Sequence, residues 1–147
     1  MDDVDAFVAS VMPLLSEEVQ ALHGGNVGPR MALWSHQEPV TLFGAVLTQR
    51  GWNAIEPAFE WLATTFHLSG SYDYEVLAAG VSGDLGYIAG IEHSVAATSL
   101  DTDPRSYQLR VTTVFRREDG AWKVVHRHGD PYDPASATVP PGRASAR

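Results

Sequence analysis

The side chains best suited to chemistry in this sequence are one carboxylate, one guanidinium and two imidazoles: Glu92, Arg110, His126 and His128. Burial among apolar residues raises the pKa of a carboxyl group and a nearby cation lowers it, so such a set can be tuned for proton transfer. We therefore interpret Glu92 as a general acid or base, with His126 or His128 as its proton-exchanging partner. Arg110 would stabilise negative charge that develops on a substrate.

Strand pairing brings these residues together in our prediction. A turn at residues 118–120 would pair residue 116 with residue 122, and Thr112 then lies opposite His126. In the same register Arg110 lies opposite His128, and Glu92 joins them from the neighbouring strand with Arg110 as its ion-pair partner. Two interpretations remain open: a functional polar cluster at the base of a pocket, and a structural ion pair that only fixes the sheet register.

Four aromatic residues are candidates for the apolar wall of such a pocket: Trp34, Phe43, Trp52 and Trp61. Together with Thr112 they form the predicted substrate-binding set. Large aromatic side chains at helical spacing more often belong to the core, so a purely structural role stays open for them.

The His126-x-His128 pair also raises the question of a metal, because residues two apart on a strand point the same way and imidazole suits zinc or iron. Glu92 or Asp130 could supply a third ligand. Two histidines without a fixed third ligand form a weak motif, so we predict no metal and no cofactor. The chain has no cysteine, and it has no Gly-x-Ser-x-Gly, phosphate-loop or dinucleotide motif.

The order of elements indicates the α+β class. Apolar residues recur every three or four positions over residues 3–22, which predicts a helix that Pro13 should kink or divide. Further helices are expected over residues 28–34 and 54–66, the latter capped by Asn53, with a short strand over residues 40–43 between them. From residue 68 the period changes to two, which predicts an antiparallel meander of strands over residues 72–79, 86–98, 107–117 and 122–128.

Composition narrows the class of protein. The 147 residues are 44% hydrophobic and 19% charged, which is typical of one globular domain. A formal net charge of −8 disfavours nucleic acid as a partner, and no apolar run is long enough to span a membrane. The acidic start is unlike a secretory signal, so we expect a cytoplasmic protein. Residues 1–130 are predicted to form the domain, and the Pro-, Ala-, Ser- and Arg-rich residues 131–147 a disordered tail.

Three short segments and one longer one carry a resemblance to a known family. They are Ala32-Leu33-Trp34-Ser35, Val40-Thr41-Leu42-Phe43-Gly44, Gly83-Asp84-Leu85-Gly86-Tyr87 and the run from Arg116 to His128, with its Arg-Arg, acidic-Gly turn, Trp and His-x-His. With the order of elements, this resembles the SnoaL-like branch of the nuclear transport factor 2-like superfamily. It is also similar to the association domain of calmodulin-dependent kinases.

The resemblance implies a cone-shaped α+β barrel, in which N-terminal helices pack on a curved, mostly antiparallel sheet around one pocket. It implies binding of a small, largely apolar or carboxylate-bearing molecule, with acid–base isomerisation, cyclisation or (de)hydration as the activity. A non-catalytic binding or assembly module of the same fold is the alternative. The catalytic sets of ketosteroid isomerases and of epoxide hydrolases with this fold have no matching set in this chain. The resemblance to the kinase association domain supports Glu92 facing the pocket.

The expected partner is a second copy of the chain. One face of the sheet is predicted to be apolar and uncovered, with Leu109, Val111, Thr113 and Phe115 along one strand and Val125 on the next. A stripe of this kind is larger than monomers usually expose, so we expect a homodimer formed through it. The resemblance implies the same mode of pairing.

Overall fold

The N-terminal helix begins and ends where its sequence provides caps. In the computed structural model, which describes residues 2–44, 46–98 and 103–136, α1 runs over Asp3–His23. The Asp2 carboxylate accepts a hydrogen bond from the backbone N–H of Asp5 at 2.8 Å, which satisfies a free donor of the first turn. Pro13 lies inside this single continuous helix, so the alternative in which it divides the helix is wrong.

Two further helices follow, α2 (Gly28–Leu33) and α3 (Trp52–Thr65). The prediction that Asn53 caps α3 is wrong, because the helix begins one residue earlier and Gly51 stands at the N-cap. Gly51 has a φ of 87°, a conformation that glycine adopts without strain. The carboxylate of Glu38 accepts a hydrogen bond from the backbone N–H of Trp52 at 2.8 Å. It therefore satisfies a free donor in the first turn of α3, although it lies 14 positions earlier in the chain.

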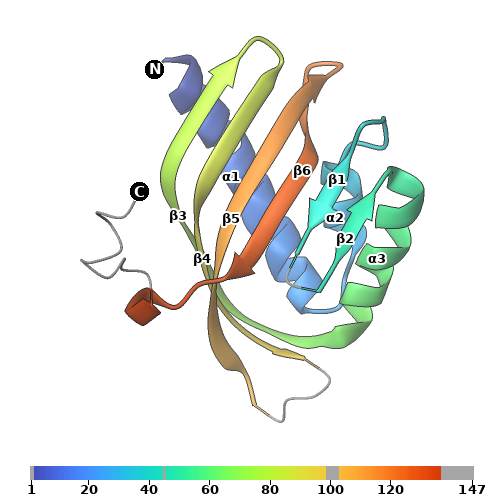
Figure 1. Ribbon diagram of the computed structural model, residues 1–147, viewed down its shortest axis with the longest axis vertical. Helices are drawn as coiled ribbons and strands as arrows, with labels where there is room; N and C mark the ends of the chain where they lie inside the picture. The colour runs from blue at the N-terminus through green and yellow to red at the C-terminus, as the bar shows by residue number, and fades with distance from the viewer. Residues whose placement is uncertain (1, 45, 99–102, 137–147) are drawn as a thin grey trace, which may run out of the picture.

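Six strands form one sheet in the order β2-β1-β6-β5-β4-β3. The strands are β1 (Thr41–Phe43), β2 (Thr48–Arg50), β3 (Phe66–Ser82), β4 (Leu85–Thr98), β5 (Arg105–Glu118) and β6 (Ala121–Pro131). All neighbours are antiparallel except β1 and β6. The sheet curls with the helices on its concave side (Figure 1), which confirms the predicted α+β fold and the meander. Strand β2 was not predicted from the sequence.

The turn between β5 and β6 is shorter than predicted. Asp119 and Gly120 alone form it, with φ angles of 52° and 82° that suit a tight hairpin. Residue 117 therefore pairs with Trp122, and residue 116 with residue 123. The predicted pairing of residue 116 with residue 122 is wrong by one position, and every assignment of β5 side chains to a sheet face is inverted.

A β-bulge in β6 then reverses which side chains of that strand face the core. Phe115 pairs with Val124 and Val114 with His126, which leaves Val125 as the extra residue. Before the bulge Val124 faces the core, and beyond it Arg127 does. Without the bulge His126 would have faced inward, as the sequence predicted.

The stripe predicted as a dimer interface is part of the core instead. Val111, Thr113 and Phe115 are at most 2% exposed. Phe7 of α1 contacts Phe115 and Trp122 edge-to-face, with ring centroids 5.4 and 4.8 Å apart. These side chains cover the concave face of the sheet, so they cannot form an interface with another chain.

Two remaining expectations concern the C-terminal residues and membrane-spanning helices. Strand β6 continues to Pro131, and residues 134–136 form a short 3-10 turn, η1 (Pro134–Ser136). The rest of the predicted disordered tail, residues 137–147, lies outside the described residues. None of the helices described is long and apolar enough to cross a bilayer.

Candidate functional site

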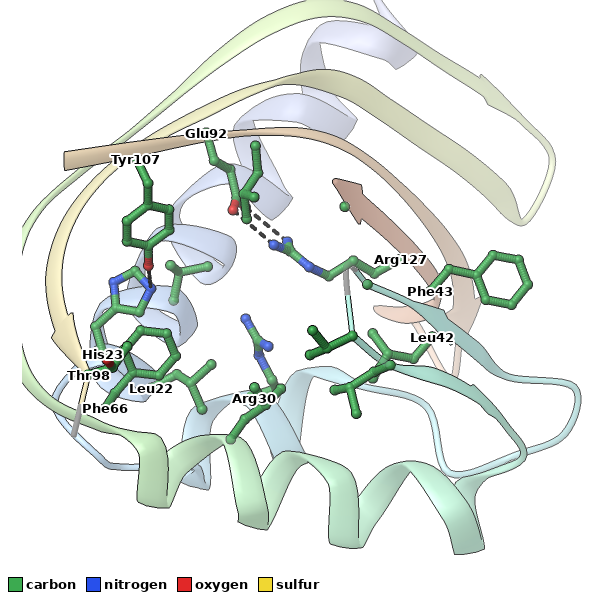
Figure 2. A pocket seen from close by; sticks show the side chains of 17 residues that line it. Leu22, His23, Arg30, Leu42, Phe43, Phe66, Glu92, Thr98, Tyr107 and Arg127 are labelled. Carbon is green, nitrogen blue, oxygen red and sulfur yellow. Dashed lines mark hydrogen bonds and ion pairs between the residues drawn. The ribbon is translucent and has the colours of Figure 1, made fainter. Parts of the chain in front are cut away.

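A pocket of about 330 Å³ opens between the helices and the concave face of the sheet (Figure 2). Its wall is mainly apolar, and the polar side chains that reach it are few: His23, Arg30, Glu92, Thr98, Tyr107 and Arg127. An apolar cavity with a small number of convergent polar groups is the usual form of a small-molecule site. The apolar part of the wall comes from α1, the β1–β2 hairpin, the end of α3 and the strands β3 and β5, including Val19, Leu22, Leu42, Leu47, Leu62, Phe66 and Leu109.

Glu92 and Arg127 form a buried ion pair on the floor of this pocket. Both terminal nitrogens of Arg127 donate to the carboxylate of Glu92, each at 2.9 Å. The Tyr72 hydroxyl donates to the same carboxylate at 3.1 Å. Burial by itself would raise the pKa of Glu92, but the Arg127 charge and hydrogen bonds outweigh it and hold that pKa below its ordinary value. Glu92 is therefore ionised at neutral pH, and hydrogen bonds occupy both of its oxygens.

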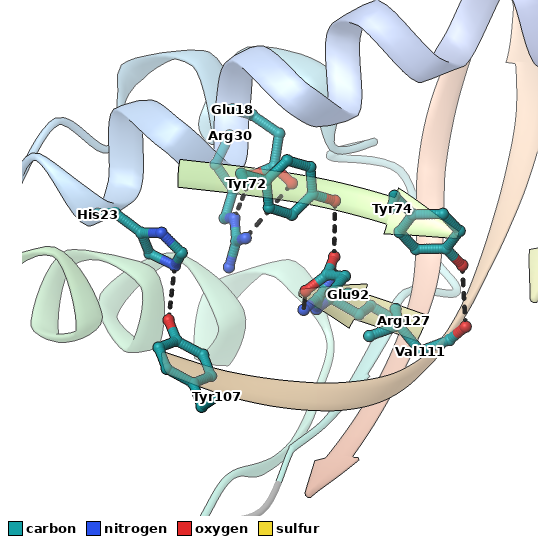
Figure 3. Close-up of polar contacts among 9 residues, drawn as sticks. All are labelled: Glu18, His23, Arg30, Tyr72, Tyr74, Glu92, Tyr107, Val111 and Arg127. Carbon is teal, nitrogen blue, oxygen red and sulfur yellow. Dashed lines mark hydrogen bonds and ion pairs between the residues drawn. The ribbon is translucent and has the colours of Figure 1, made fainter. Parts of the chain in front are cut away.

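A second buried pair joins Glu18 of α1 to Arg30 of α2 (Figure 3). Nε of Arg30 donates to one oxygen of Glu18, and Nη2 donates to the other at 3.3 Å. The guanidinium also lies 5.2 Å from the centre of the Phe59 ring, a cation–π contact. The two pairs are close enough that the Arg30 charge contributes to the lowered pKa of Glu92.

His23 and Tyr107 form the third polar group of the site. The Nε2 atom of His23 lies 2.9 Å from the Tyr107 hydroxyl. Burial, followed by the Arg30 charge, lowers the pKa of His23 to about 4, so its ring is neutral at neutral pH. Burial and the Glu92 charge raise the pKa of Tyr107 to about 12. The other ring nitrogen of His23, Nδ1, is buried and has no hydrogen-bond partner among the described residues.

Of the four residues predicted to carry catalysis, Glu92 alone reaches the pocket. The prediction that Arg110 pairs with Glu92 is wrong, because Arg110 is on the outer face of the sheet and 60% exposed. There it makes two hydrogen bonds of 2.8 Å to Asp130, the residue opposite it on β6. The predicted inward position failed because the shorter turn inverts β5.

His126 and His128 also lie on the outer face. Both contact the ring of Phe43 edge-to-face, with centroids 5.1 and 5.6 Å apart, and His126 is 2.7 Å from the Thr41 hydroxyl. Burial and the nearby His128 lower the pKa of His126. No cluster of three or more metal-ligating side chains exists among the described residues. Thr112 pairs with His128 and is exposed on the same outer face, so it too is outside the pocket.

The aromatic candidates divide between the core and the surface. Trp34 is 2% exposed and packs edge-to-face on Phe59, while Trp52 stacks on His36. Trp61 is 51% exposed. Phe43 is the one member of this set that belongs to the pocket wall, although its ring points away from the cavity in Figure 2.

Sequence reasoning missed most of the polar groups that do line the site. Glu18 had a detectable signal, because it interrupts the apolar stripe formed by Val11, Leu15 and Leu22 at the same helical spacing. A charged residue on a buried helix face requires a buried partner. Arg127 had no such signal, since its inward position depends on the bulge.

Comparison with known proteins establishes the family. A family model for the SnoaL-like domain matches residues 11–132. The chain belongs to the SnoaL-like family. No curated protein sequence matches this SnoaL-like chain.

Solved structures share the fold at low sequence identity. A candidate dehydratase of the NTF2-like family from Streptomyces avermitilis superposes with a TM-score of 0.69 at 17% identity, covering 88% of this chain and 98% of that one. A ketosteroid isomerase-like protein from Erwinia carotovora atroseptica has the same TM-score at 12% identity, covering 86% and 97%. A candidate calcium/calmodulin-dependent protein kinase II association domain from Xanthomonas campestris reaches 0.64 at 17% identity, covering 90% and 91%. At these identities the likeness concerns the fold of the SnoaL-like chain alone.

Proposed function

We propose that this SnoaL-like protein binds a small, largely apolar molecule in the pocket between its helices and its sheet. The observation that carries the proposal is the apolar wall around a cavity of about 330 Å³. A cavity of roughly 150 Å³ in another protein holds one benzene molecule. The pocket therefore has room for a molecule of about two fused six-membered rings.

The state of Glu92 favours binding over proton transfer by this residue. A general base needs a free lone pair directed at the substrate, and a general acid needs a proton near neutral pH. Glu92 carries no proton near neutral pH, and three hydrogen bonds from Arg127 and Tyr72 stabilise its carboxylate and lower its pKa, which makes it a weak base. Its predicted partners Arg110, His126 and His128 face away from the pocket, so we do not assign the acid–base reaction to this set.

Acid–base catalysis remains a second candidate, and one observation favours it. Tyr107 lines the pocket, keeps its hydroxyl proton at neutral pH and can donate a hydrogen bond to a carbonyl oxygen, while the neutral His23 lies 2.9 Å from that hydroxyl. Such a donor favours loss of a proton next to the carbonyl, the step that begins isomerisation of an unsaturated ketone and dehydration of a β-hydroxy ketone. Exchange of such protons for deuterium in 1-tetralone, followed by NMR in D₂O, would detect this step. Exchange that the protein accelerates and that Tyr107→Phe abolishes would support this candidate, and no exchange above the rate in buffer would contradict it.

The binding proposal is tested by filling the pocket. Gly129 lines it, and a Cβ at this position would meet its neighbours at 3.5 Å or more, so a larger side chain is accommodated by the backbone and projects into the cavity. Gly129→Leu should abolish binding of 1-tetralone in isothermal titration calorimetry. Ala78→Leu, which adds the same side chain at an exposed position of β3, is the matched control and should bind normally. Equal binding by both variants would contradict the proposal.

We also propose that the protein is a homodimer, as the family resemblance implies. The interface must use residues other than the half-buried Leu109 and the buried Val111, Thr113 and Phe115, all on the concave face. The outer face of the sheet offers Tyr87, which is 42% exposed and lies on the side of β4 opposite to Glu92.

A further inference from the structure

Two buried carboxylates belong to the polar end of the pocket: Glu92 lines the cavity, and Glu18 pairs with Arg30, which also lines it. Arg30 donates to both oxygens of Glu18, and Arg127 donates to both oxygens of Glu92. Tyr72 adds a further hydrogen bond to Glu92. Each carboxylate is already neutralised by an arginine, so a protonated amine would add one uncompensated positive charge to a buried space, which is costly.

A donor is available in the same place. Arg30 uses Nε and Nη2 for Glu18, and its remaining terminal nitrogen, Nη1, has no hydrogen-bond partner among the described residues. In Figure 2 the guanidinium of Arg30 points from α2 into the middle of the pocket, between Leu42 and Tyr107. A guanidinium nitrogen carries two N–H groups at this position, and both are free to donate to a ligand.

The charges of this region sum to zero. Glu18 and Glu92 contribute two negative charges, Arg30 and Arg127 contribute two positive charges, and His23 is neutral at neutral pH. A carboxylate ligand would therefore leave one net negative charge in a buried, mainly apolar space, which is costly. A carbonyl oxygen can accept the same N–H groups without adding a charge, and a hydrogen bond from a charged donor is among the stronger ones.

We propose that the ligand of this pocket is a neutral molecule of about two fused rings with a carbonyl group. Its carbonyl oxygen accepts hydrogen bonds from Nη1 of Arg30, and Arg30 therefore determines which polar group the pocket selects. This inference rests on the proposed function and decides between the apolar and the carboxylate-bearing ligands that the sequence left open. Ketones, esters and quinones share the required acceptor. The Glu18–Arg30 pair then has a role beyond packing, because Glu18 holds the guanidinium in place and cancels its charge.

Three probes of nearly equal size test the head group in the unmodified protein. Tetralin has no polar atom, 1-tetralone adds a carbonyl, and 1,2,3,4-tetrahydro-1-naphthoate adds a carboxylate. By isothermal titration calorimetry at pH 7 we expect 1-tetralone to bind about tenfold more tightly than tetralin, the effect of one hydrogen bond to a charged donor. The carboxylate should bind more weakly than 1-tetralone. Equal binding of tetralin and 1-tetralone would overturn the inference while leaving the proposed function intact, and tighter binding of the carboxylate would also overturn it.

A double variant tests the assignment to Arg30. Glu18→Gln combined with Arg30→Met removes both charges together, so no buried charge is left unpaired, and the fold should be kept. We expect this variant to lose the about tenfold preference for 1-tetralone over tetralin, a ratio measured on the same variant. Arg110→Met, which removes an arginine from the outer face, should keep the preference. A preference that survives the double variant would contradict the role of Arg30, and binding of none of the probes by the unmodified protein would instead contradict the proposed function.

Discussion

Removal of the Arg127 guanidinium tests how the buried charges contribute to stability. In Arg127→Met, Glu92 keeps the Tyr72 hydrogen bond and loses both hydrogen bonds to arginine, although its side chain is only 3% exposed. A buried carboxylate that has lost its cation costs about 3–5 kcal/mol. Domains are commonly stable by about 5–15 kcal/mol, so the variant should lose a large share of its free energy of unfolding. Urea unfolding at pH 7, followed by circular dichroism, measures the loss.

The loss should depend on pH in a definite direction. In the unmodified protein the pKa of Glu92 is lowered below its ordinary value of 4.5, so the pair stabilises the fold above that value and this contribution disappears as the pH falls through the folded pKa. In the variant burial still raises the pKa of Glu92, and only the Arg30 charge and the Tyr72 hydrogen bond oppose it. The difference in stability should therefore shrink as the pH is lowered from 7 towards 4.5, by up to about 1.4 kcal/mol per pH unit.

The chain contains a matched control for this experiment. Arg110 and Asp130 form a bidentate pair with bonds of 2.8 Å, close in geometry to the Arg127–Glu92 pair, but on the exposed outer face. Arg110→Met should show no comparable loss, because solvent screens exposed pairs. The double variant Glu92→Gln with Arg127→Met should recover most of the stability. An Arg127→Met loss below about 1 kcal/mol at pH 7, or one that is the same at pH 5, would refute the reasoning.

Three other outcomes follow from the same structure. Thr113→Val should raise the free energy of unfolding in urea by about 1 kcal/mol, because the Thr113 hydroxyl is buried without a hydrogen-bond partner among the described residues. A decrease of about 1 kcal/mol would instead mean that the hydroxyl makes a hydrogen bond. The ring of His23 should stay neutral down to a pH of about 4 in an NMR titration, and stability should fall as the pH drops from 6.5 to about 4, since the unfolded chain binds a proton there that the folded chain does not. A midpoint above 6 would contradict this. Light scattering of the unmodified protein at micromolar concentration should give a dimer, and a monomeric mass would contradict this. Phe115→Asp should unfold the chain because Phe115 is fully buried, and a folded Phe115→Asp variant would contradict that expectation.

The sequence predicts where most helices and strands lie, but it does not predict correctly which side chains of β5 and β6 face the core. Periodicity predicts α1 to within one residue at its end, and the change from a period near four to a period of two predicts the four long strands. Strand β2, Thr48–Arg50, is as short as β1 but consists of polar residues, so it lacks the apolar run that predicted β1. It forms by pairing with β1 as a local hairpin.

The site residues predicted on β5 and β6 were wrong because of two local features, a turn and a bulge. The prediction placed Glu92 on the pocket side because the resemblance to the kinase association domain supported that face, and Glu92 lines the pocket. It then assumed a three-residue turn before β6 and an uninterrupted strand after it. The two-residue turn at Asp119 and Gly120 inverted β5, and the bulge at Val125 replaced His126 with Arg127 on the inner face. The Asp119-Gly120 pair is itself a local signal for a two-residue hairpin turn that the prediction did not use. The bulge has no such local signal.

The two buried ion pairs divide between the layers of the molecule. Glu18 and Arg30 are twelve positions apart and join α1 to α2, whereas Glu92 and Arg127 are 35 positions apart and join β4 to β6. Neither buried ion pair therefore crosses between the helices and the sheet. When the helices dock on the sheet, none of these four buried charges has to find its partner across the closing interface, which apolar side chains largely fill. We therefore expect the rate of this docking step to vary little with ionic strength.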